Sequence, residues 1–228
     1  MSLHIGFLLF PRLTQLDFTG PFEVLSRLPG AAVRMLWKEA GPVRSDTGLS
    51  ILADTGFADC PQLDIICVPG GPGVAALMED AAVLDFLRAQ AAGARYVTSV
   101  CTGALVLGAA GLLRGKRATT HWASHDFLAA LGATPVAARV VRDGKLFTGG
   151  GVTAGIDFAL TIAAEIAGPA VAQAIQLQIE YAPAPPFNAG HPDTAPAEVL
   201  DAARSRGAAM RAEREALVAR VAARLAAA

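Results

Sequence analysis

Tyr96-Val-Thr-Ser-Val-Cys101-Thr-Gly103-Ala-Leu-Val-Leu-Gly-Ala-Ala-Gly111 is the stretch that decides the fold of this 228-residue chain. Its first five residues favour a β-strand, and from Thr102 onward apolar and small residues recur with helical spacing. A single cysteine stands where one pattern changes to the other. The stretch therefore predicts a strand, a tight turn and a helix, with Cys101 on the turn, where open α/β sheets place their sites.

A thiol on such a turn has two alternative roles. The first N–H groups of a helix are unpaired and its dipole is positive there, which favours a thiolate and predicts a nucleophile near neutral pH. Most free cysteines, however, are small buried apolar residues and nothing more. The position on the turn favours the reactive role for Cys101.

Composition limits the class of protein. Apolar residues make up 53% of the chain and charged residues 17%, which suits one large α/β domain. A net charge of −1 and a pI near 6.4 give no reason to expect a nucleic acid or an anionic membrane as partner. No apolar run is long enough to span a membrane and no secretion signal is visible, so we expect a cytoplasmic protein. Cysteines at 60, 67 and 101 form neither a disulfide framework nor a metal-binding pair.

An acidic residue is expected at the same edge as the cysteine. The apolar run His4 to Phe10 predicts a first buried strand, and residues 14–28 carry a helical stripe. Asp17 therefore lies near the carboxyl end of the first strand. It is either an acid–base partner of Cys101 or a carboxylate that caps the helix, and the sequence leaves both readings open.

A glycine cluster follows the strand predicted at residues 64–68. The cluster reads Pro69-Gly-Gly-Pro-Gly73 and could turn backbone amides into a site as an anion-binding concavity. Pro72 has no N–H, so Gly71 and Gly73 are the expected donors. The spacing matches neither a phosphate loop nor a dinucleotide fingerprint. An ordinary turn is the alternative.

The remaining segments alternate between strand and helix, which predicts a parallel sheet covered on both faces. Strands are expected at 32–38 and 116–122, hairpins at 41–54 and 138–148, helices at 123–131, 152–166, 169–181 and 195–228, and an extended segment at 183–192. The run Gly149-Gly150-Gly151 suggests a backbone path that other residues cannot follow, with the backbone of Gly150 and Val152 at the edge of the site.

At this point the residues resemble a known family, the PfpI-like branch of the class-I glutamine-amidotransferase-like superfamily. The motifs that carry this resemblance are Pro69-Gly-Gly71, Ser99-Val-Cys-Thr-Gly103, Thr119-Thr-His-Trp122 and Gly149-Gly-Gly-Val-Thr-Ala-Gly-Ile-Asp157. Within that branch the chain is similar to the isocyanide hydratases in four segments. These are Gly6-Phe-Leu-Leu-Phe10, Gln15-Leu-Asp-Phe-Thr-Gly-Pro21, Arg95-Tyr-Val-Thr-Ser-Val-Cys-Thr-Gly103 and Glu180-Tyr-Ala-Pro-Ala-Pro-Pro-Phe-Asn-Ala-Gly190.

The resemblance implies a flavodoxin-like three-layer α/β sandwich with a mostly parallel sheet and a nucleophile-elbow cysteine. We expect this domain over residues 1–190 and a helical extension over 191–228, packed on the body or on a dimer partner. The implied protein is a homodimer that uses no cofactor. It converts an isocyanide and water to an N-substituted formamide through a covalent thioimidate.

In this resemblance Cys101 is the nucleophile, Asp17 its acidic partner and Thr102 a residue that positions groups around the site. Many hydrolases of the superfamily carry histidine directly after the nucleophile, and the threonine at that place argues against peptidase chemistry. His121 could supply a base from its own strand end, although a histidine beside a tryptophan is more often structural.

Three other classes remain open. A glyoxalase-like or deglycating enzyme would use the same cysteine and carboxylate on a carbonyl. A ligand-sensing domain related to those of AraC-type regulators shares the segment Thr119 to Trp122, but the chain shows no paired helix-turn-helix units. A redox sensor would use the oxidation of Cys101 itself.

Overall fold

A seven-stranded sheet forms the centre of the computed structural model, which describes residues 2–227. Its strand order is β10-β11-β7-β6-β1-β2-β5, and every pair of neighbours is parallel except β10 with β11. Its strands are β1 (Leu3–Leu8), β2 (Ala31–Trp37), β5 (Thr55–Gly56), β6 (Ile65–Val68), β7 (Tyr96–Val100), β10 (Val140–Asp143) and β11 (Leu146–Gly149). Two small sheets lie outside it and pair β3 (Gly41–Arg44) with β4 (Ser50–Ala53) and β8 (Arg117–Ala118) with β9 (Thr134–Pro135).

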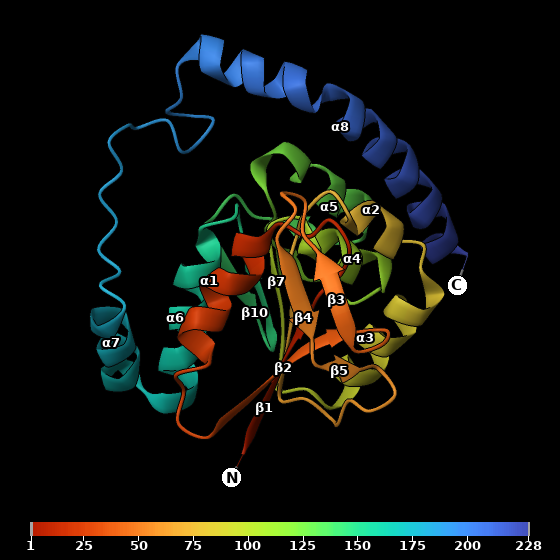
Figure 1. Cartoon of the computed structure of the whole chain (residues 1–228). Coiled ribbons are helices and arrows are strands. Elements are labelled where there is room, and N and C mark those ends of the chain that lie inside the picture. Colours follow the sequence, from red (N-terminus) through yellow and green to blue (C-terminus); the bar gives the residue numbers. More distant parts are fainter. Residues whose placement is uncertain (1, 228) are drawn as a thin grey trace.

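Helices cover both faces of the sheet. The described helices are α1 (Gln15–Leu25), α2 (Val74–Leu77), α3 (Ala81–Gly93), α4 (Gly103–Ala109), α5 (Phe127–Ala130), α6 (Ala154–Ala167), α7 (Pro169–Gln178), α8 (Ala197–Ala226) and the 3₁₀ turn η1 (Trp122–Ser124). Helices α1 and α6 pack together on one side, whereas α3 and α4 lie on the other (Figure 1). The predicted three-layer sandwich is confirmed.

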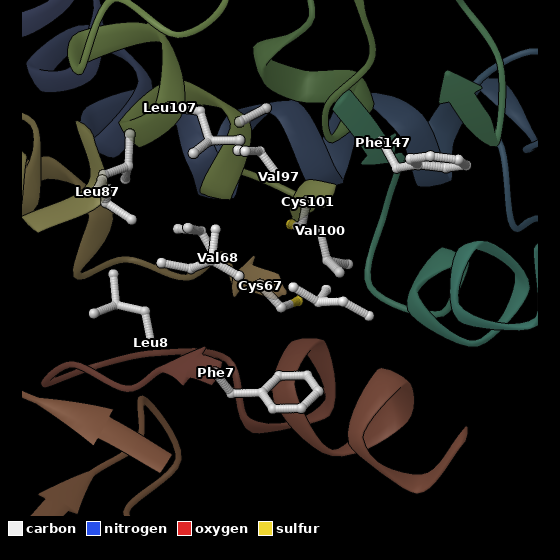
Figure 2. Packing of buried hydrophobic residues seen from close by; sticks show 14 of the residues in the cluster. Phe7, Leu8, Cys67, Val68, Leu87, Val97, Val100, Cys101, Leu107 and Phe147 are labelled. Atoms are coloured by element: carbon white, nitrogen blue, oxygen red, sulfur yellow. The ribbon is translucent and has the colours of Figure 1, made fainter. Parts of the chain in front are cut away.

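The core sits between these layers and explains the apolar runs in the sequence. Every residue of β6 and β7 is buried, as expected for parallel strands covered on both faces. Figure 2 shows Cys67 and Cys101 among apolar side chains of the core, with Val68 and Val100 nearby. The buried strands β6 and β7 directly precede the glycine cluster and Cys101, so their packing in the core determines where these two segments lie.

One local expectation differs from the structure. The helix expected over 123–131 is instead η1 followed by the single turn α5, because Ser124 and Asp126 favour turns over helix. On the other side of the sheet, Pro21 lies inside α1, which packs against α6. A Cβ on Gly155 would lie 2.9 Å from Cδ of Pro21, so this glycine allows α6 to approach α1 closely.

An extended connector at residues 182–196 leads to α8, and Figure 1 shows it running apart from the body. Helix α8 has 30 residues, but only four of its side chains are buried: Arg214, Leu217, Val218 and Val221. These lie in its second half, which contacts α4, α5 and η1. None of the helices described in residues 2–227 combines the length and apolar character needed to cross a membrane.

Candidate active site

Cys101 occupies a strained turn between β7 and α4, as the sequence predicts. Its φ is 54°, a left-handed value that costs a non-glycine residue about 1–2 kcal/mol. The surrounding backbone holds this conformation, because the Cys101 N–H donates to the carbonyl oxygens of Gly149 at 3.1 Å and Gly150 at 2.8 Å. The hydroxyl of Thr120 donates to the Cys101 carbonyl at 2.7 Å. Such stored strain at a strand-to-helix turn is typical of a nucleophile position.

Asp17 lies in the first turn of α1 and is completely buried. The helix cap is Thr14, and the carboxylate accepts its hydrogen bond from the Gly70 N–H, at 2.9 Å to Oδ2. The alternative of a capping carboxylate is therefore wrong. The other oxygen, Oδ1, has no hydrogen-bond partner among residues 2–227. Burial raises the pKa of Asp17 to about 7, against the opposing effects of the Gly70 N–H and the Cys101 thiol.

The ionisation of Cys101 differs from the expectation based on the helix dipole. Burial raises the pKa of the Cys101 thiol, and the negative charge of Asp17 raises it further. The N–H of Thr102 acts in the opposite direction, but α4 has only seven residues and the cysteine is only 6% exposed. The expected thiolate is therefore disfavoured. Instead, a protonated thiol faces a carboxyl group that titrates near neutral pH.

The glycine cluster and Thr102 form the wall behind this pair. The Gly71 N–H donates to Oγ1 of Thr102 at 3.0 Å, and the Gly73 N–H donates to the carbonyl of Arg12 at 3.2 Å. Neither N–H is therefore free to bind a ligand. Gly70, which the sequence analysis did not single out, contacts both sides of the site. A Cβ on it would lie 2.6 Å from the Thr102 nitrogen and 2.7 Å from Asp17 Oδ2. The feature of the sequence that could have identified Gly70 is its position within the motif Pro69-Gly-Gly71.

The run Gly149-Gly150-Gly151 reaches the site, but not for the reason expected. None of the three has a left-handed φ, and a Cβ on any of them would find its nearest neighbour at 3.4 Å or more. The expectation of a backbone path closed to other residues is therefore wrong. The Gly150 N–H donates to the carbonyl of Arg139 at 2.9 Å, whereas the Val152 N–H has no partner within the described chain.

His121 lies beside the site and has a structural contact. Its Nδ1 accepts a hydrogen bond from the Ala123 N–H at 3.3 Å, which caps η1, and its ring packs against Trp122. Burial lowers the pKa of His121, and the charge of Arg214 lowers it further, so the ring is neutral at pH 7. Arg214 itself comes from α8, and no sequence motif pointed to it.

No group of three His, Cys, Asp or Glu side chains in residues 2–227 is arranged to hold a metal ion.

Comparisons with known proteins agree with this geometry. The sequence model of the DJ-1/PfpI family matches residues 4–165. An isonitrile hydratase of Pseudomonas putida is 64% identical over 225 residues, which covers 99% of each chain. The crystal structure of a ThiJ/PfpI family protein from Pseudomonas syringae matches with a TM-score of 0.93 at 44% identity, covering 96% of this chain and 91% of that one.

A more distant relative is the HTH-type transcriptional regulator GbdR of Pseudomonas aeruginosa. It is 32% identical over 188 residues, which cover 78% of this chain and 50% of the regulator. The family match includes the strand, elbow and helix around Cys101 as well as Asp17 and the glycine cluster. The chain belongs to the DJ-1/PfpI family.

Proposed function

We propose that the protein is an isocyanide hydratase, which converts an isocyanide, R–N≡C, and water to an N-substituted formamide. The observation that carries this function is the buried pair of Cys101 and Asp17. Oδ1 of Asp17 has no hydrogen-bond partner in the part of the chain that the structure describes, and burial raises the pKa of Asp17 to about 7. The isonitrile hydratase of Pseudomonas putida, which is 64% identical over 99% of this chain, supports the same reaction.

In the first step the Cys101 sulfur attacks the terminal carbon of the isocyanide. Because the thiol keeps its proton, Asp17 in its carboxylate form accepts that proton as the C–S bond forms. The carboxylic acid then donates the proton to the same carbon. The product is a thioimidate, R–N=CH–S–Cys101, which has gained the sulfur and the hydrogen of the thiol.

In the second step water adds to the thioimidate carbon. Asp17, again a carboxylate, takes a proton from water while the oxygen bonds to carbon, and the proton passes to the nitrogen. The tetrahedral species R–NH–CH(OH)–S–Cys101 then breaks its C–S bond, and the hydroxyl proton returns to sulfur through Asp17. This releases the formamide and restores the thiol, so the cycle consumes one water and requires no redox or metal cofactor.

Backbone groups assist these steps. The Thr102 N–H lowers the pKa of the Cys101 thiol and so stabilises the sulfur anion as it leaves the tetrahedral species. The Val152 N–H lies two residues beyond Gly150 and has no partner among the described residues, so it serves as the donor to the thioimidate nitrogen. Gly70, Gly71 and Thr102 hold Asp17 and the elbow in place.

The experiment is direct. Purified protein is incubated with cyclohexyl isocyanide, and the formamide is followed by proton NMR, with methylglyoxal as the competing carbonyl substrate. We expect formamide from wild type and from the control Cys60→Ala, and none above background from Cys101→Ala. A mass increase of one isocyanide on the Cys101 peptide after acid quench would mark the thioimidate. Turnover of methylglyoxal without turnover of the isocyanide would refute the proposal in favour of a glyoxalase.

The proposal includes a homodimer in the cytoplasm. The connector before α8 and helix α7 carry exposed apolar side chains, Phe187 at 79% and Leu177 at 81%. Apolar surface of this extent supports a second copy as partner. We also propose residues 1–190 as the catalytic domain and 191–228 as its helical extension. Three free cysteines fit a reducing compartment.

A further inference from the structure

A groove with a volume of about 720 Å³ lies between η1 and α8. One wall consists of His121, Trp122 and Ala123, and the other consists of α8 side chains between Ala203 and Glu215. This volume is within the range of small-molecule sites, which commonly measure about 300–1,000 Å³. The reaction proposed above uses none of the α8 residues in this wall.

Arg214 lies in the groove wall and has no counter-ion within residues 2–227. It is only 8% exposed, and its strongest contact is a hydrogen bond from Nη1 to the neutral hydroxyl of Ser124 at 3.0 Å. Its Nε is buried without a hydrogen-bond partner among residues 2–227, and Nη2 meets only the sulfur of Met210 at 3.6 Å. Nε and Nη2 form the edge of a guanidinium that binds a carboxylate with two parallel hydrogen bonds.

Two neighbouring arginines on α8 have acidic partners. Arg211 pairs with Asp126 at 2.6 Å, and Arg220 pairs with Glu79 at 3.1 Å. Arg206 and Arg224 form no ion pair among residues 2–227, but both are exposed, whereas Arg214 is buried. The backbone there is held firmly, because Leu217 and Val218 in the next turn are buried in the core. A buried cation that lacks a partner is unfavourable, so an anion that reached it would be bound strongly.

The groove borders a segment that contacts the backbone of Cys101. The hydroxyl of Thr120 donates to the Cys101 carbonyl at 2.7 Å, and the next residue, His121, lines the groove. Cδ2 of His121 lies 3.5 Å from the position of a Cβ on Gly151, in the segment whose carbonyls bind the Cys101 N–H. We infer that a molecule held at Cys101 by one end reaches the groove by passing His121.

We propose that this groove binds the R group of an isocyanide that carries a carboxylate, with Arg214 as the partner of that carboxylate. Trp122 and Met210 contact the apolar part of the R group, since both line the groove. A carboxylate fits better than a doubly charged phosphate, because one guanidinium edge supplies two parallel donors and a single positive charge. This assignment rests on the proposed function and specifies its substrate class.

The test compares an isocyano carboxylic acid with its methyl ester as substrates. In wild type we expect kcat/KM for the acid to exceed that for the ester by at least about tenfold, as for a buried charge pair. In Arg214→Gln the preference should vanish through a higher KM for the acid, while the ester keeps its kinetic constants. Arg214→Lys should retain part of the preference. Arg220→Gln removes the same charge from the same helix and should change neither substrate.

Equal kcat/KM for acid and ester in wild type would overturn the assignment. So would an equal loss for both substrates in Arg214→Gln, since this would mark a structural or electrostatic role. Calorimetric titration with the N-formyl amino acid product tests the groove without catalysis, and its methyl ester should bind at least about tenfold more weakly. This comparison uses wild type alone and so decides the matter if Arg214→Gln does not fold. Carboxylate binding without hydration of either isocyanide would refute the proposed function and leave only a carboxylate site at Arg214.

Discussion

The N–H of Gly70 donates to Oδ2 of Asp17 at 2.9 Å, and this bond joins residues 53 positions apart in the chain. It fixes one carboxyl oxygen against the glycine loop and leaves Oδ1 for proton transfer. The glycine loop therefore orients the carboxyl group, while burial raises its pKa against the opposing effects of the Gly70 N–H and the Cys101 thiol.

Asp17→Asn tests proton transfer. An amide can neither take the thiol proton nor protonate the substrate carbon, so we expect isocyanide turnover to fall by about 10²–10⁴-fold. In wild type the pKa of Asp17 is raised to about 7, and the reaction begins from the carboxylate. The wild-type kcat/KM should therefore rise with pH through about 7 and then level off. Steady-state assays from pH 5 to pH 9 check this, and near-normal turnover in Asp17→Asn would exclude the role.

The same residue should affect stability in a pH-dependent way. The folded-state pKa of Asp17 is raised from 3.8 to about 7, so between these values the folded state holds a proton that the unfolded state has lost. Wild type therefore loses stability as pH rises through this range, by as much as about 4 kcal/mol. Asp17→Asn lacks this loss. Urea unfolding of both proteins at pH 5, 6, 7 and 8 should show that the free energy of unfolding of Asp17→Asn increases relative to that of wild type as pH rises. A difference between the two proteins that does not change with pH would contradict the prediction.

Thr102 can be tested by two substitutions, of which one removes the hydroxyl and the other keeps it. Its Oγ1 accepts the Gly71 N–H at 3.0 Å in a buried setting. Thr102→Val should leave that N–H unpaired and lower the free energy of unfolding by about 1–3 kcal/mol. Thr102→Ser keeps the acceptor and should remain closer to wild type in both stability and turnover. A loss of stability in Thr102→Ser as large as that in Thr102→Val would contradict a specific role for the hydrogen bond.

Gly70→Ala should distort the site through a steric clash. The new Cβ would lie 2.6 Å from the Thr102 nitrogen, which is backbone and cannot swing away, and 2.7 Å from Asp17 Oδ2. We expect a loss of at least about tenfold in kcat, because a shift of this size disturbs proton-transfer geometry. Gly56→Ala is the matched control, since its Cβ would meet its nearest neighbour at 3.5 Å. Kinetic constants of both variants decide the point.

The proposed dimer is tested by adding charge to exposed apolar positions. Leu177 and Phe187 are 81% and 79% exposed, and in a dimer they would be covered. Light scattering should give wild type the mass of two chains, and the double variant Leu177→Asp with Phe187→Asp the mass of one. Leu52→Asp, at a position 62% exposed on the β3–β4 hairpin, should stay dimeric. A monomeric wild type at micromolar concentration would refute the proposal.

Local patterns in the sequence determined the sheet and the placement of its loops. Strand and helix periods depend on neighbouring residues, so β7, the elbow at Cys101 and α4 could be predicted from one stretch. Parallel strands bring their carboxyl ends to one edge, and this was enough to expect Asp17 near Cys101. The pattern failed at 123–131, where polar residues divide an apolar stripe into two short turns.

Only the tertiary structure decided the chemistry of the site. A pKa depends on burial and on charges from distant segments, so the cysteine that a helix start alone would ionise is instead held as a thiol by burial and Asp17. Hydrogen-bond partners are equally non-local: the N–H groups of Gly71 and Gly73 are used by Thr102 and Arg12. The unpaired guanidinium of Arg214 follows from the same cause, because its partners depend on where α8 crosses η1, and no residue near it in sequence specifies that crossing.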